Sequence, residues 1–143
     1  MSTFHYLARA VVIRGDSILL VRAKGASNTF LPGGHIEFAE TAHRALKREL
    51  LEETGCEIDV GEFLGAVEHL WPDSSRENHE SNLVFCVKIN GCPEGGDPIS
   101  MEEHLDLFWA KLSELEKYNL QPKPLIQLIN RRCTWGSTLD GRA

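Results

Sequence analysis

The sequence contains no long hydrophobic run, no internal repeat and no low-complexity tract. None of its apolar stretches approaches the roughly 20 residues of a membrane-spanning helix, and the N-terminus lacks the pattern of a secretory signal. The 4 cysteines form no CxxC pair, so neither a zinc ribbon nor a thioredoxin-type redox motif is indicated. These absences favour a cytoplasmic protein with reduced thiols and no membrane partner.

Positive charge is also scarce. The chain has 15 basic and 21 acidic residues, which gives a formal net charge of −6. This balance argues against a nucleic-acid-binding surface over the whole protein, although it is compatible with a small basic pocket. A length of 143 residues with 42% hydrophobic content suits one well-packed domain and is too short for two ordinary ones. We expect a single domain over residues 1–133 and a loosely ordered polar tail over residues 134–143.

Strand-like and helical patterns alternate along the chain. A polar excursion is expected at residues 72–80 and a loop at residues 91–98. Helices separated by strand pairs indicate an α/β protein whose sheet is covered on both faces. Two helices are predicted, at residues 41–54 and 122–132. Segments rich in β-branched, aliphatic and aromatic residues predict strands at 4–13, 17–23, 58–71, 81–90 and 105–110.

The first predicted helix carries acidic residues on the side expected to face the core. Glu49 and Glu53 are like charges one turn apart, which destabilises a helix by roughly 0.2–0.5 kcal/mol. Near the negative end of the helix dipole each carboxylate is disfavoured by a further 0.3–1 kcal/mol or so, a cost that a bound cation would offset. Hard oxygen ligands favour magnesium, manganese or calcium. The alternative is a solvated acidic surface on which Glu52 pairs with Arg48. The stripe follows the i, i+4, i+7, i+11 spacing of a core-facing seam and consists of Ala42, Leu46, Glu49 and Glu53.

A tight turn precedes this helix. Pro32, Gly33 and Gly34 allow positive φ and let the backbone approach a ligand closely. From this turn to the end of the helix the sequence resembles the box of the Nudix hydrolases. That box reads Gly, five residues, Glu, seven residues, Arg-Glu, an aliphatic residue, any residue, Glu-Glu, any residue, Gly and an aliphatic residue. Cys56 departs from it by standing in the last aliphatic position. The matching residues are Gly34, Glu40, Arg48, Glu49, Leu50, Glu52, Glu53 and Gly55.

The resemblance implies a Nudix-type α/β/α sandwich with a mixed β-sheet between helices, and an enzyme that hydrolyses pyrophosphate bonds. It implies that Arg48 orients the glutamates, and that Mg²⁺, with Mn²⁺ as a substitute, is the cofactor. The general base would be Glu49 or a further glutamate from a loop outside the box. The implied metal ligands are Glu49, Glu52, Glu53 and the carbonyl group of Gly34. The candidates for the additional base or ligand are Glu80, Glu102 and Glu103, each of which is also compatible with a plain surface position.

Four residues outside the core of the box are candidates for substrate binding. Arg9 is a charge in the middle of a predicted strand, which suggests contact with solvent or with a phosphate. Arg22 precedes the glycine turn and His35 follows it, although solubility explains both equally well. Trp71 is a candidate for stacking on a base, as are other aromatic residues that are equally compatible with the core.

Three functions remain open at this stage. The first is a magnesium-dependent hydrolase of a nucleoside diphosphate linked to another moiety, such as ADP-ribose, a nucleotide sugar or a dinucleotide. The second is a nucleoside triphosphate pyrophosphohydrolase of the housecleaning or RNA 5′-end type. The third is a non-catalytic nucleotide sensor, which the intact set of glutamates disfavours. The expected partner is a small nucleotide substrate. Nucleic acid is expected only in the form of an RNA 5′ end. The protein could also form a homodimer.

Overall fold

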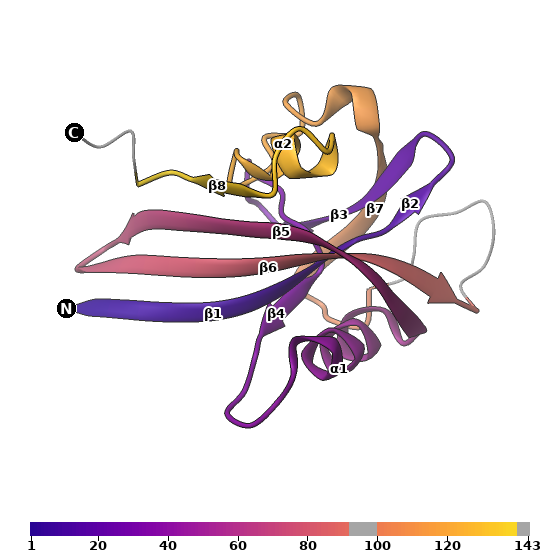
Figure 1. Cartoon of the computed structure of the whole chain (residues 1–143), viewed down its shortest axis with the longest axis horizontal. Helices are drawn as coiled ribbons and strands as arrows, with labels where there is room; N and C mark the ends of the chain where they lie inside the picture. The colour runs from indigo at the N-terminus through magenta and orange to yellow at the C-terminus, as the bar shows by residue number, and fades with distance from the viewer. Residues whose placement is uncertain (92–99, 140–143) are drawn as a thin grey trace.

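The computed structural model describes residues 1–91 and 100–139, in which two β-sheets pack between two helices (Figure 1). The larger sheet has the order β4-β1-β6-β5-β8 and the smaller one the order β2-β3-β7. β1 pairs with β6 in parallel, and β5 with β8, whereas the other pairings are antiparallel. The strands are β1 (Ser2–Val11), β2 (Ile13–Arg14), β3 (Ser17–Ala23), β4 (Gly33–His35), β5 (Glu57–Asp73), β6 (Arg76–Asn90), β7 (Leu105–Lys111) and β8 (Trp135–Ser137).

The helices α1 (Ala42–Thr54) and α2 (Leu125–Ile129) lie on opposite sides of the sheets (Figure 1). Each helix covers its own hydrophobic core. The two cores use alternate residues of the same strands, as β3 shows with Leu19 in one core and Ile18 and Leu20 in the other. This arrangement confirms the predicted α/β/α sandwich with a mixed sheet. The helix residues buried in the two cores are Ala45, Leu46 and Leu50 of α1, and Leu125, Leu128 and Ile129 of α2.

Local sequence signals set both ends of α1. The Thr41 hydroxyl accepts a hydrogen bond of 3.1 Å from the backbone N–H of Arg44, which satisfies one of the unpaired donors of the first turn. Gly55 ends the helix in the left-handed conformation, with φ of 72°. The predicted helix is therefore confirmed at both ends.

Three segments differ from the sequence-based expectation. β5 continues to Asp73 and β6 begins at Arg76, so most of the predicted polar excursion is strand, because β6 pairs along this length with both β5 and β1. The second helix spans only Leu125–Ile129, where prolines in the preceding turn lack backbone donors. Within the predicted loose tail, Trp135–Ser137 form β8 and pair with β5. Most of the predicted loop at residues 91–98, and residues 140–143, lie outside the described residues.

Two further observations bear on the expected environment. In the part of the chain that the structure describes, neither helix is long and apolar enough to cross a membrane. The expectation of reduced thiols is wrong for Cys56, which is disulfide-bonded. Cys86 and Cys133 are free.

Candidate active site

The two glycines of the predicted turn open strand β4, where Gly33 pairs with Arg9 and Gly34 with Ala8 of β1. We keep the name glycine turn for Gly33 and Gly34, which lie between β1 and α1. Gly33 has φ of 136°, and a Cβ atom there would lie 2.1 Å from the carbonyl oxygen of Ala8 on β1. At Gly34 a Cβ atom would lie 2.5 Å from the carboxyl carbon of Glu49. Both positions therefore require glycine, the first for contact with the backbone and the second for contact with a carboxylate.

Two glutamates of α1 converge on this turn. Glu53 is 3% exposed, and its Oε1 atom accepts a hydrogen bond of 3.0 Å from the backbone N–H of Gly33. Glu49 lies one helical turn earlier, with 18% of its side chain exposed, against Gly34. The side chain of Glu52 is 51% exposed. The predicted acidic stripe is thus buried at Glu53 and half-buried at Glu49, and the solvated alternative applies only to Glu52.

Arg48 connects the residues around the turn. Its guanidinium donates two hydrogen bonds of 2.9 Å to Glu40, one of 2.9 Å to Glu49 and one of 2.9 Å to the carbonyl oxygen of His35. Its Nη1 atom also lies 3.6 Å from Oε1 of Glu52. The hydrogen bonds from Arg48 lower the pKa of Glu40 to about 2. These contacts are those expected of a residue that orients the glutamates.

Burial changes the electrostatics of the two inner carboxylates. Desolvation raises the pKa of Glu53 to about 7, against the opposing effects of the Gly33 N–H and of Arg9. Burial also raises the pKa of Glu49, although the hydrogen bond from Arg48 opposes the shift. Two desolvated carboxylates side by side therefore favour a proton or a cation between them.

A cavity of about 490 Å³ opens in front of these carboxylates. Its wall contains Gly33, Gly34, Glu49 and Glu53. It also contains five of the residues that were predicted as substrate-binding residues or as an additional base. Arg22 and Glu103 line neither this cavity nor its neighbour. Arg22 instead lies over the ring of Phe108 at 5.1 Å, and Glu103 is exposed. The five residues in the cavity wall are Arg9, His35, Trp71, Glu80 and Glu102.

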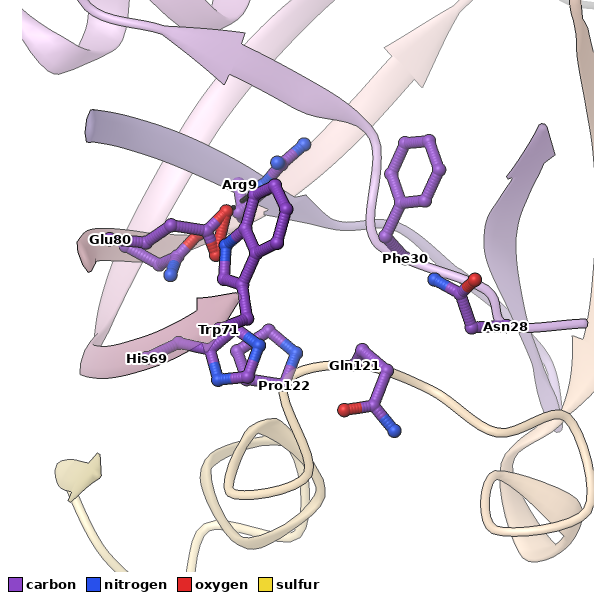
Figure 2. A pocket seen from close by; sticks show the side chains of 9 residues that line it. Arg9, Asn28, Phe30, His69, Trp71, Glu80, Gln121 and Pro122 are labelled. Atoms are coloured by element: carbon purple, nitrogen blue, oxygen red, sulfur yellow. Dashed lines mark hydrogen bonds between the residues drawn. The ribbon is translucent and has the colours of Figure 1, made fainter. Parts of the chain in front are cut away.

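A second cavity of about 420 Å³ continues the first toward α2 (Figure 2). The two cavities form one groove because they share Arg9, Phe30, Trp71 and Glu80. Figure 2 shows Trp71 and Phe30 on opposite sides of the second cavity. We call the first cavity the acidic half of the groove and the second the aromatic half.

Arg9 stands at the junction of the two halves. Its Nη1 atom donates a hydrogen bond of 3.1 Å to the carbonyl oxygen of Leu31, and its Nε atom one of 3.4 Å to Asn82. Its guanidinium lies 5.6 Å from the centre of the Phe30 ring. Burial lowers the pKa of Arg9, and the nearby carboxylate of Glu80 opposes this most strongly. A guanidinium remains charged in such a site, so Arg9 supplies a fixed positive charge in an otherwise acidic groove.

Two histidines form part of the wall between the turn and Trp71. Nδ1 of His5 lies 2.9 Å from Nε2 of His35, and Nε2 of His5 lies 2.8 Å from Oδ1 of Asn78. The His5 ring stacks on Trp71 at a centroid distance of 6.3 Å. The histidine pair thus holds His35 and Trp71 in fixed positions relative to each other.

The sequence matches the model of the NUDIX domain over residues 4–129. The chain belongs to the NUDIX family. The resemblance inferred from the box is therefore confirmed, and members of this family generally use divalent metal ions.

Individual relatives of this NUDIX chain differ in their named activities. An ADP-ribose pyrophosphatase from Methanocaldococcus jannaschii is 35% identical over 113 residues, which cover 71% of this chain and 64% of the relative. A CTP pyrophosphohydrolase from Escherichia coli is 28% identical over 124 residues, covering 82% of this chain and 85% of the relative. The crystal structure of a MutT NUDIX hydrolase from Burkholderia pseudomallei superposes with a TM-score of 0.64 at 26% identity, covering 78% of this chain and 85% of that chain. The matched region is thus less than two thirds of the first of these proteins.

The carboxylates beside the glycine turn of this NUDIX chain are oxygen donors of the type that binds divalent metal ions. Within residues 1–91 and 100–139, no three acidic, histidine or cysteine side chains are already arranged to hold a metal. Arg48 lies 2.9 Å from the carboxylate of Glu49 and 3.6 Å from that of Glu52. The carboxylate of Glu49 lies against Gly34, in space that a Cβ atom would fill. The carboxylate of Glu53 accepts a hydrogen bond from the adjacent Gly33, so oxygen atoms of both glutamates lie beside the glycine turn. Hard oxygen donors of this kind suit Mg²⁺ or Mn²⁺.

Glu102 reaches the acidic half because its segment is tied to the end of α1. The backbone N–H of Met101 donates a hydrogen bond of 2.8 Å to the carbonyl oxygen of Glu53. The charge of Glu102 contributes to the raised pKa of Glu53. Glu102 is therefore a candidate loop glutamate whose charge acts on a carboxylate of α1.

Sequence analysis missed most of the aromatic half. Asn82 is 1% exposed within a strand, and its role as a partner of Arg9 depends on the parallel pairing of β1 with β6. Phe30 directly precedes the glycine turn, which was its only signal. The other missed residues come from distant segments and are Asn28, Gln121 and Pro122.

Proposed function

We propose that this chain is a Mg²⁺-dependent hydrolase that cleaves the pyrophosphate bond of a nucleoside diphosphate linked to another moiety, of the ADP-ribose, nucleotide-sugar or dinucleotide type. The observation that carries the proposal is the continuous groove, whose acidic half meets its aromatic half at Arg9. A substrate with a flat base at one end and a charged diphosphate in the middle matches this groove, because the base would lie in the aromatic half and the diphosphate at Arg9 and the acidic half. The ADP-ribose pyrophosphatase among the relatives supports this choice of substrate.

Each half of the groove has its own task in this proposal. Glu49, Glu52, Glu53 and the Gly34 carbonyl would hold the metal, with Mn²⁺ able to replace Mg²⁺. The bound cation neutralises charge on the pyrophosphate and lowers the pKa of the attacking water. Arg48 keeps Glu49 in position through the hydrogen bond between them.

The remaining groups bind substrate and accept a proton. The guanidinium of Arg9 contacts phosphate oxygens at the junction, and Trp71 stacks on the base. The carboxylate of Glu102 takes the proton of the attacking water as the water oxygen bonds to phosphorus. The phosphoanhydride bond breaks on the opposite side. The products are a nucleoside monophosphate and the phosphorylated second moiety.

A second candidate function has specific support. The CTP pyrophosphohydrolase from Escherichia coli matches over 85% of its own length, more than the ADP-ribose pyrophosphatase does. The same groove would then accept a nucleoside triphosphate and release a monophosphate and pyrophosphate. The third possibility, a silent sensor, leaves unexplained why Arg48 holds Glu40 and Glu49 in a fixed network.

A substrate panel tests the proposal. Release of phosphorylated products would be measured with Mg²⁺ for ADP-ribose, nucleotide sugars, dinucleoside polyphosphates, nucleoside triphosphates and triphosphorylated RNA. We expect the highest kcat/KM with a diphosphate-linked substrate, and loss of that activity in Glu53→Gln. Highest activity on triphosphates would establish the second candidate. Nucleotide binding without hydrolysis anywhere in the panel would contradict both and indicate the sensor.

A further inference from the structure

The carboxylate of Glu80 occupies an unusual position at the inner end of the aromatic half. It is half-buried on β6 and lines both cavities. In the described part of the chain it makes no hydrogen bond or ion pair, although its charge acts on Arg9 and on His69. Figure 2 shows Glu80 beside Trp71 and Arg9. A half-buried carboxylate without a direct donor is costly unless a ligand supplies one.

Asn82 and Nδ1 of His69, which line the same cavity as Glu80, are already engaged. Oδ1 of Asn82 accepts from Arg9, and its Nδ2 atom donates to the carbonyl oxygen of Val67 at 3.2 Å. Nδ1 of His69 lies 2.9 Å from the hydroxyl of Thr138. The amide of Asn82 thus has no strong group left for a ligand. Glu80 is the charged acceptor that remains in this wall, and an ionised carboxylate can only accept hydrogen bonds.

We propose that Glu80 makes the aromatic half selective for nucleobases that carry an exocyclic amino group, namely cytosine, adenine and guanine, over uracil and thymine. This inference rests on the proposed function, since it assigns the base of the same substrate. An amino group offers N–H donors to the carboxylate. Uracil and thymine offer one ring N–H flanked by two carbonyl oxygens, which repel a carboxylate that approaches it.

The aromatic walls do not provide this selectivity themselves. Trp71 and Phe30 present ring faces, and stacking on a ring face accepts every base. Discrimination between bases of similar size requires a hydrogen bond that one base can complete and the other cannot. Glu80 lies next to Trp71 in the pocket and satisfies this condition (Figure 2).

A simpler role for Glu80 is to balance the charge of Arg9. Burial lowers the pKa of Arg9, and Glu80 is the carboxylate that raises it most. The two roles predict different results. Loss of charge balance changes the affinity for every nucleotide by the same factor, whereas loss of a base contact changes the ratio between bases.

The test compares binding of CMP and UMP by calorimetry, together with kcat/KM for pairs of substrates that differ only in cytosine or uracil. In the wild type we expect the cytosine ligand to bind about tenfold more tightly. In Glu80→Gln, whose amide can also donate to a carbonyl, we expect the difference to fall within about threefold. Glu80→Asp keeps the carboxylate and should retain part of the preference. The control is Glu57→Gln, which removes an exposed charge at the start of β5 and should leave the ratio unchanged.

Each result separates this inference from the function on which it rests. Normal hydrolysis with equal binding of CMP and UMP overturns the selectivity and leaves the proposed function intact. An equal change for both ligands in Glu80→Gln, with the ratio preserved, assigns Glu80 to charge balance and also overturns it. Failure to bind any nucleotide overturns the proposed function and the selectivity together. Thermal unfolding of the variants shows whether each remains folded.

Discussion

The two halves of the groove are built in different ways. The glycines and inner carboxylates of the acidic half come from two short segments, the turn at Gly33 and Gly34 and the end of α1, which span 21 residues from Gly33 to Glu53. The rest of its wall comes from β1, β5, β6 and the segment around Glu102. The aromatic half draws on β1, β5, β6 and the segments near residues 30 and 121. The inner carboxylates are therefore specified by helical spacing, and the aromatic half by pairing of strands that are distant in sequence.

This difference suggests how the two halves contribute to function. The acidic half needs fixed chemistry, so its residues are held by a dense set of contacts around Arg48. In the aromatic half, Glu80 has no described hydrogen-bond partner, and Trp71 is held by ring stacking on His5. We therefore expect variants in the acidic half to lower the rate of the chemical step, and variants in the aromatic half to change substrate affinity.

The largest effect is expected for Glu53→Gln. The amide keeps the acceptor for the Gly33 N–H but loses the negative charge, so kcat should fall by about 10²-fold or more at saturating Mg²⁺ while the fold persists. Circular dichroism and the melting temperature check the fold. Glu57→Gln is the matched control, and near-normal turnover of Glu53→Gln would remove Glu53 from the site.

The two glycines of the turn should respond differently to alanine. Gly33→Ala meets the Ala8 backbone at 2.1 Å with φ of 136°, and should destabilise the protein by about 1–3 kcal/mol or more. Gly34→Ala meets only the end of the Glu49 side chain, at 2.5 Å, so stability should change little while displacement of the carboxylate lowers kcat about tenfold. Urea unfolding and steady-state kinetics measure the two effects. Equal loss of stability in both variants would contradict this distinction.

In the aromatic half, Trp71→Ala should raise KM by about tenfold and leave kcat within a factor of about three, because a stacking surface is lost and the carboxylates are untouched. Trp71→Phe keeps a ring and should be close to wild type. Steady-state kinetics on the best substrate of the panel gives both constants. A fall in kcat without a change in KM would place Trp71 with the acidic half instead.

The last prediction concerns the pH dependence of stability without metal, which involves no substrate. Burial raises the pKa of Glu53 from an ordinary value of 4.5 to about 7, so the native state retains a proton that the unfolded state has lost between these values. The free energy of unfolding should therefore fall as the pH rises from 4.5 to 7, and the slope from this group should vanish above 7.

Urea unfolding in the presence of EDTA measures this slope. Glu53→Gln should flatten it, and the variant should gain stability relative to the wild type at neutral pH. A slope that is unchanged in Glu53→Gln would show that another group is responsible.

The sequence alone determined the acidic half and the overall architecture. Thr41 and Gly55 mark the ends of α1, and a period of 3.6 residues places Glu49 and Glu53 on one face of it, so these predictions needed only neighbours along the chain. Within the helix, Glu49 and Glu53 line the groove and Glu52 does not. Outside the helix, the positions of the proposed site residues depend on strand pairing. Arg9, His35, Trp71, Glu80 and Glu102 line the groove, whereas Arg22 and Glu103 do not.

Only the tertiary structure decided which of those residues meet. Arg22 lies on the face of β3 that packs against Phe108, a placement set by the pairing of β3 with β7. Asn82 reaches Arg9 because β1 and β6 are parallel neighbours, although 73 residues separate them in the chain. A helix brings residues together through local hydrogen bonds of fixed period, whereas a sheet does so through long-range pairing whose order and register the sequence of one strand does not contain.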